Sequence, residues 1–132
     1  MSKINQKQIE YWKQSALRTW KVSLSLYKNK HYDACLFFCH LSIEKLLKGL
    51  ITKQTQDNPP YIHDLKTLAK IAKVKISEEQ NDQLGILTTF NIAGRYSDVK
   101  HDFYKKCTKN YTKQYLDVSK QLFLWLKKEY QK

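Results

Sequence analysis

The stretch YDACLFFCHLSIEKLLKGLITK, residues 32–53, decides the fold. When these residues are placed on a helix, apolar side chains cover most of its circumference, which is typical of a helix surrounded by other helices. A narrow polar stripe remains at His40, Glu44 and Lys48, which follow one another at intervals of one turn. Residues 32–53 are therefore predicted to form the central helix, with the polar stripe facing water, a partner or a ligand.

Other helices are expected on both sides of this one, from apolar residues at helical spacing and from capping residues. Asn5 with Gln8 is a candidate cap for the first helix, Asp64 for the third, and Ser77-Glu78-Glu79-Gln80 is a capping-box pattern for the fourth. The expected helices besides 32–53 span residues 6–28, 64–73, 77–94 and 108–129. Long helices with short connections pack as an antiparallel bundle. Residues 1–132 are therefore predicted to form a single all-α domain, an up-and-down bundle of four to five helices.

Composition supports a globular helical protein. The chain has 132 residues, of which 42% are hydrophobic and 27% charged, with only 3 Gly and 2 Pro. So few turn-forming residues argue against a β-sandwich or barrel. The sequence shows no apolar run long enough to span a membrane and no apolar secretory leader, so we expect a cytoplasmic protein that does not enter a membrane.

Several kinds of chemistry are not indicated by the sequence. It shows no Gly-rich phosphate loop, no HExxH motif, no nucleophile elbow and no paired carboxylates. The three cysteines, Cys35, Cys39 and Cys107, are expected to be small buried thiols, since no second pair of ligands completes a metal site. We therefore expect neither a metal nor a cofactor.

The net charge of +12 is unevenly distributed. Residues 1–30 carry seven basic and one acidic residue, and residues 99–132 carry nine basic and three acidic residues, whereas residues 31–98 carry eight of each. If the two terminal segments pack side by side, they form one basic face suited to a polyanion. The alternative is a solvated surface that keeps the protein soluble.

The segment from Gly94 to Cys107 is predicted to be non-helical and functional. Arg95 and His101 within it suit phosphodiester cleavage, because an arginine can hold the phosphate and a histidine can transfer protons near neutral pH. On one continuous helix their side chains would diverge by about 120°. They therefore converge only if the chain bends between them. The alternative is that Arg95 caps a helix and His101 lies on the surface.

Two further groups of residues leave alternatives open. The stripe of His40, Glu44 and Lys48 either lines a cleft or dimer seam, or is a ladder of side-chain pairs along one helix. Tyr96 and Tyr104 lie among lysines, where aromatic rings can stack on nucleobases.

The order of several short motifs resembles the HEPN family, the higher eukaryotes and prokaryotes nucleotide-binding domain. The motifs are Tyr32-Asp33-Ala34, His40-x-x-x-Glu44-Lys45-x-x-Lys48, His63-Asp64-Leu65, Gly94-Arg95-Tyr96-Ser97-Asp98, and Trp125-Leu126 in the final helix. The Arg-Tyr-x-Asp form is similar to the branch with the pattern Arg-Tyr-Pro-Asp, which is associated with minimal nucleotidyltransferases. Ser97 stands in the position of the proline.

The resemblance implies a homodimeric helical domain that binds nucleotide or RNA and partners a minimal nucleotidyltransferase in a toxin–antitoxin-like pair. The alternative it implies is a metal-independent endoribonuclease toxin, with Arg95 and His101 as catalytic residues across the dimer interface. Tyr96, Asp98 and Tyr104 then join the polar stripe as candidate ligand or interface residues.

Overall fold

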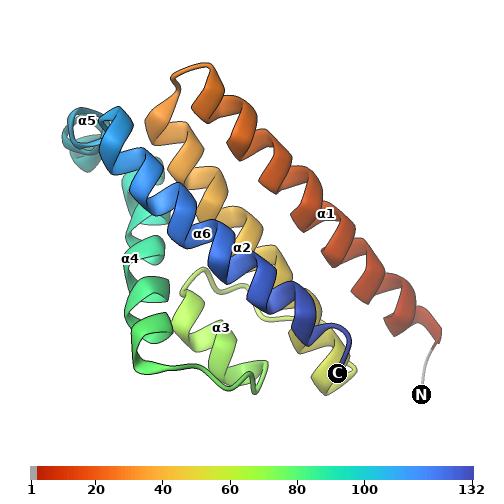
Figure 1. Cartoon of the computed structure of the whole chain (residues 1–132). Coiled ribbons are helices and arrows are strands. Elements are labelled where there is room, and N and C mark those ends of the chain that lie inside the picture. Colours follow the sequence, from red (N-terminus) through yellow and green to blue (C-terminus); the bar gives the residue numbers. More distant parts are fainter. Residues whose placement is uncertain (1–2) are drawn as a thin grey trace.

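Residues 3–132 fold into six helices, which are labelled in Figure 1. The computed structural model describes residues 3–132, and the side chains of residues 3–5, 97 and 98 lie outside the described part. The helices are α1 (Lys3–Lys28), α2 (Tyr32–Thr55), α3 (Leu65–Ile71), α4 (Glu78–Arg95), α5 (Ser97–Lys106) and α6 (Lys109–Glu129). The prediction of an all-α helical bundle is confirmed, with six helices in place of four to five.

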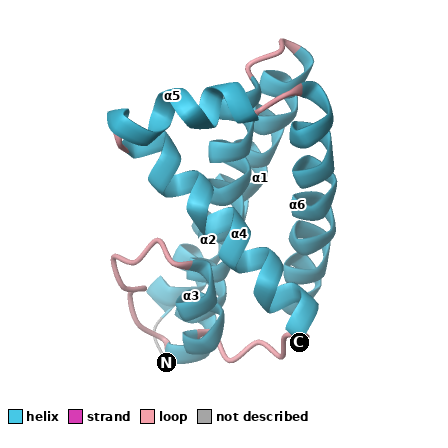
Figure 2. Cartoon of the chain, turned by 90° about the vertical axis from the view of Figure 1, so that its left-hand side faces the viewer, coloured by secondary structure: helices cyan, strands magenta, loops and turns pink. Residues whose placement is uncertain are grey.

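The helix α2 lies at the centre, as predicted from its apolar circumference. The other five helices all contact it, and α1, α4 and α6 pack along its length (Figures 1 and 2). Its fully buried side chains include Leu36, Ile43 and Leu47. The short helix α5 crosses one end of the bundle, while α3 lies near the opposite end, so these two helices mark the two ends of the molecule.

The predicted caps of α3 and α4 are confirmed. Asp64 accepts a hydrogen bond from the backbone N–H of Thr67 at 3.1 Å. Ser77 and Gln80 form a reciprocal capping box, in which each side chain accepts from the other residue's backbone N–H at 3.0 and 2.9 Å. Such caps satisfy N–H groups that the first turn of a helix leaves unpaired. The candidate cap Asn5 lies within α1, which begins earlier at Lys3, and its side chain is outside the described part.

The prediction of non-helical backbone from Gly94 to Cys107 is wrong for most of that segment. Residues 97–106 form α5, Cys107 follows it, and between α4 and α5 only Tyr96 is non-helical, with extended dihedral angles of φ −111° and ψ 120°. The cause is tertiary packing, since Phe103 of α5 is buried and its ring lies 5.5 Å from that of Phe90 in α4. One apolar anchor of this kind holds a short helix that its sequence favours only weakly.

The two terminal helices, α1 and α6, both pack on α2 and contact each other beside it. The rings of Trp20 in α1 and Phe123 in α6 are stacked with centroids 5.3 Å apart. Near the C-terminus, the Tyr130 hydroxyl donates to the carbonyl of Leu46 at 2.6 Å, and Gly49 leaves room for that ring because an added Cβ would collide with the hydroxyl. The two basic segments are thus carried by neighbouring helices, as a shared basic face requires.

Candidate functional site

The predicted polar stripe of α2 is buried. His40, Glu44 and Lys48 are exposed by only 0%, 4% and 7%. Of the environments predicted for this stripe, exposure to water is therefore wrong, whereas the alternative of side-chain pairs along one helix is present between Glu44 and Lys48. The segment between α2 and α3 covers it, which the spacing of the three residues along one helix could not show.

Glu44 is the centre of a compact charged network. Its Oε2 accepts a hydrogen bond from Lys48 Nζ at 3.0 Å, and its Oε1 accepts one from His63 Nδ1 at 3.0 Å. Both carboxylate oxygens are therefore satisfied, as a buried carboxylate requires. His63 is 46% exposed in its side chain, so the network reaches the surface at that residue. These contacts fasten the α2–α3 segment to the central helix.

His40 lies beside this network, with its Nε2 3.8 Å from Oε1 of Glu44. Its Nε2 donates to the carbonyl oxygen of His63 at 2.9 Å, which leaves Nδ1 buried without a hydrogen-bond partner among the described residues. Burial is the main cause that lowers the pKa of His40 below its usual value, and the positive charge of Arg95 lowers this pKa further. Burial thus favours the neutral form of His40, which lies within electrostatic reach of Arg95.

Arg95 is the last residue of α4 and is exposed. Its Nε donates to Oδ1 of Asn91, one turn earlier, at 3.1 Å. Asn91 is only 4% exposed, so its position is held by the core. A guanidinium has five N–H donors. Because Asn91 takes the one on Nε, the terminal amino groups of Arg95 remain suited to a planar, bidentate contact with a phosphate.

The chain bends between Arg95 and His101, as convergence of the two side chains requires. Arg95 ends α4, the extended residue Tyr96 follows, and His101 lies exposed on α5. No hydrogen bond or ion pair joins Arg95 to His101 within the described part of the chain. Tyr96 and Tyr104 are 58% and 64% exposed, and the side chain of Asp98 lies outside the described part.

Three apolar side chains close to Arg95 along the chain are exposed. Ile92, Tyr96 and Val99, all within four residues of Arg95, are 50%, 58% and 40% exposed. A cavity of about 200 Å³ opens beside them between α2, α4 and α5, lined by residues that include Phe37, Phe38, Gly94 and Phe103. Large apolar side chains gathered on one surface are typical of a protein–protein contact.

Reasoning from the sequence missed two residues of this region. Asn91 holds Arg95, and His63 joins Glu44 to the segment that covers it. For Asn91 a signal was present, because an asparagine one turn before an arginine can pair with it on a helix. His63 was named only within the motif His63-Asp64-Leu65, and nothing in the sequence indicated its pairing with Glu44, 19 residues away.

The three cysteines are buried and unpaired, as predicted. Burial raises the pKa of Cys107 to about 12. A thiol that stays protonated near neutral pH is a poor nucleophile, so this residue belongs to the core. Separately, no helix in the described part of the chain is long and apolar enough to span a membrane.

Comparisons with known proteins agree with this architecture. The HEPN domain model matches residues 9–130, and the chain therefore belongs to the HEPN domain family. The fold is similar to the crystal structure of TT1696 from Thermus thermophilus, with a TM-score of 0.79 and 17% sequence identity over 92% of this chain and 97% of that one. No match was found among proteins with curated descriptions. Family membership supports, at a coarse level, a module concerned with nucleotides or RNA.

Proposed function

We propose that this HEPN domain is an RNA- or nucleotide-binding and interaction module, with Arg95 as its phosphate contact. One observation carries the proposal: Asn91, itself buried, fixes Nε of Arg95 at 3.1 Å while the side chain of Arg95 remains exposed. A guanidinium held in this way loses little conformational entropy when it binds a phosphate. The exposed rings of Tyr96, which precedes α5, and Tyr104, about two turns further along that helix, can stack on bases.

The proposed module is a homodimer, formed through the apolar surface around Arg95. Ile92, Tyr96 and Val99 supply apolar area for such a contact, and a two-fold axis there brings two copies of Arg95 and His101 together. The further partner we propose is a minimal nucleotidyltransferase in a toxin–antitoxin-like pair, a proposal supported by family membership and by the sequence Arg95-Tyr96-Ser97-Asp98.

The chain offers a matched control for the phosphate contact, because its two arginines are both exposed. We expect Arg95→Ala to weaken binding of a short single-stranded RNA roughly ten- to a hundredfold, the loss of a charge-assisted hydrogen bond. Arg18→Ala removes the same charge from α1 and should weaken binding much less. Fluorescence anisotropy measures both. Equal losses in the two variants would show that only net charge matters and would overturn the role of Arg95.

The dimer surface has a matched control of its own. Ile92 on α4 and Leu124 on α6 are similarly exposed, at 50% and 44%. Ile92→Asp should convert the dimer to a monomer in sedimentation velocity experiments, because a carboxylate would be desolvated at the interface. Leu124→Asp should leave the dimer intact. A monomeric wild-type protein at micromolar concentration would contradict the proposal.

A second candidate function is metal-independent RNA cleavage by Arg95 and His101. It is favoured by the bend at Tyr96, which places the two residues on different helices and removes the divergence expected on a single helix. If this candidate is correct, the wild-type dimer cleaves RNA in the presence of EDTA and leaves cyclic-phosphate ends, whereas Arg95→Ala and His101→Ala do not. If the folded wild-type dimer binds RNA without cleaving it, the cleavage candidate is wrong and the binding module remains as the function.

A further inference from the structure

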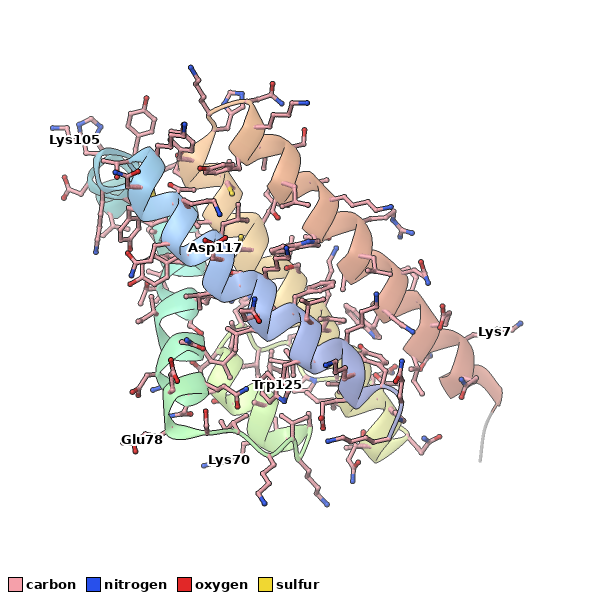
Figure 3. All side chains as sticks on the ribbon, in the orientation of Figure 1. Lys7, Lys70, Glu78, Lys105, Asp117 and Trp125 are labelled. Atoms are coloured by element: carbon pink, nitrogen blue, oxygen red, sulfur yellow. The ribbon has the colours of Figure 1, made fainter. Side chains whose placement is uncertain are left out.

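A groove that is separate from Arg95 lies between the first third of α1 and the segment that follows α2. Its volume is about 660 Å³, and its walls include Lys7, Tyr11, Trp12, Lys48, Pro59 and Tyr61. Figure 3 shows Lys7 at one end of the molecule and Lys105 of α5 at the other. The groove and the Arg95 region therefore lie toward opposite ends of the bundle.

Three aromatic side chains line this groove, and two of them project into solvent. Tyr61 is fully exposed, at 101%, and Tyr11 is 60% exposed. The rings of Tyr11 and Trp12 meet edge to face with centroids 5.8 Å apart. Burying such rings would have contributed to stability, since an aromatic side chain carries a large apolar area. Exposed rings that gather around one concavity are instead suited to binding a flat ligand.

The wall opposite α1 is stiff. Pro59 and Pro60 each fix their φ angle, Ile62 N donates to the carbonyl of Pro60 at 2.9 Å, and Asn58 N donates to Oδ1 of Asp57 at 2.7 Å. The segment is then fastened to α2 through His63 and Glu44. A ligand that enters the groove therefore orders little additional backbone, which reduces the entropic cost of binding.

The charge of the groove favours an anion. Lys7 and Lys48 line it, together with the neutral side chains of Gln8 and Asn58, and its described lining contains no carboxylate. The Nζ of Lys48 lies 5.9 Å from the centre of the Trp12 ring and also pairs with Glu44 behind the groove. Lys7 is exposed and, unlike Lys48, forms no ion pair with a carboxylate among the described residues. Its ammonium group is therefore the positive charge that a ligand in the groove can contact.

We propose that this groove binds an unpaired base of a single-stranded RNA, stacked on Tyr61 and the Tyr11–Trp12 pair, with the adjoining phosphate near Lys7. Aromatic rings interleaved with lysines are the chemistry by which proteins hold single strands, because every base presents a flat face and every nucleotide carries a charge. This site extends the proposed function to a second surface and does not depend on the role of Arg95.

The test is fluorescence anisotropy with a labelled oligouridine, which has little internal stacking, and with an abasic oligomer of the same charge. Tyr61→Ala and Tyr61→Leu should weaken binding of the oligouridine at least about fivefold, the lower limit for loss of one stacked base. Tyr61→Phe should bind as the wild type does. Because Tyr61 is fully exposed, all three variants should keep the wild-type circular dichroism spectrum.

A matched pair on α1 tests the charge. Lys7→Gln should reduce the slope of log affinity against log salt concentration by about 0.7, the value for one phosphate contact on a single strand. Lys21→Gln, which removes an exposed lysine farther along the same helix, should change that slope less.

Three results would overturn the proposal. The first is wild-type affinity in Tyr61→Ala, and the second is wild-type affinity in Tyr61→Leu, which would show that the position needs apolar contact and not stacking. The third is equal binding of the abasic oligomer. Arg95→Ala in the same assay separates the two sites. If only Arg95→Ala loses affinity, the groove proposal fails while the proposed function stands. If only the Tyr61 variants lose affinity, the groove proposal stands and the proposed phosphate contact of Arg95 is wrong.

Discussion

Glu44 and Arg95 are both charged residues within electrostatic reach of His40, yet the fold places them in opposite environments. Glu44 is 4% exposed, and both its oxygens are occupied by partners within the chain. Arg95 is exposed, and within the described part of the chain only its Nε has a partner. A charged side chain whose hydrogen bonds are all made within the protein contributes to the fold. A charged side chain that is held in place but still has unused hydrogen-bond donors can bind a ligand. Glu44 therefore belongs to the architecture, whereas the terminal amino groups of Arg95 remain available for the proposed phosphate contact.

The largest effect expected from this comparison is on stability. Glu44→Leu leaves the ammonium of Lys48 buried without its counter-charge, and it should lower the free energy of unfolding by about 3–5 kcal/mol. Urea denaturation followed by circular dichroism measures the loss. The double variant Glu44→Leu/Lys48→Met should recover most of it, because a buried ion pair replaced by apolar groups is often neutral.

An exposed ion pair serves as the control for that experiment. On α6, Nζ of Lys113 lies 2.7 Å from Oδ1 of Asp117, and the two side chains are 55% and 58% exposed. Asp117→Ala should leave the denaturation midpoint close to that of the wild type, since exposed pairs contribute little. A Glu44→Leu protein as stable as the wild type would contradict the structural role of the stripe.

A smaller effect is expected from pH. Burial lowers the pKa of His40 in the folded state, and among the charged groups near it Glu44 opposes this lowering while His63 and Arg95 add to it. The unfolded chain then binds a proton more readily than the folded one. The stability that His40 contributes is therefore present above about pH 6.5, the usual histidine value, and is lost as pH falls toward the folded pKa.

The measurement is the free energy of unfolding at about pH 7.5 and about pH 5.5, above and below the ordinary histidine pKa. The wild type should lose more stability than His40→Gln over this interval, by up to about 1.4 kcal/mol for each pH unit below the ordinary pKa. The same pH dependence in both proteins would show that His40 can be protonated where it lies.

The smallest effects are expected where function is proposed. His101→Ala should change stability by no more than about 0.5 kcal/mol, as is usual for an exposed residue. Arg95→Ala removes one hydrogen bond to Asn91 and should cost about 1 kcal/mol. The same urea titration measures both. A loss as large as that of Glu44→Leu would make Arg95 part of the architecture and would remove the contrast between the two regions.

Much of the fold could be predicted because its signals are local. The central position of α2 follows from its apolar circumference, and the starts of α3 and α4 follow from Asp64 and Ser77, whose side chains bond within their own first turns. The start of α5 had no such signal, because Tyr96 makes no side-chain cap and the helix is anchored by Phe103 on α4.

The candidate site was predictable only in part. Arg95, His101 and the polar stripe could be selected by residue type and spacing, because helical periodicity relates residues a few positions apart. The link between His63 and Glu44, 19 residues apart, and the groove between α1 and the segment after α2 depend on packing between distant parts of the chain.

The sequence by itself determined that this protein is a helical bundle around residues 32–53, because apolar periodicity and capping chemistry act within a few residues. Only the tertiary structure decided which charges are buried and which are available. Burial depends on what covers a side chain, and for the α2 stripe that cover comes from a segment with no periodic relation to it. The same physical reason separates Glu44, which holds the molecule together, from Arg95, which the molecule presents to solvent.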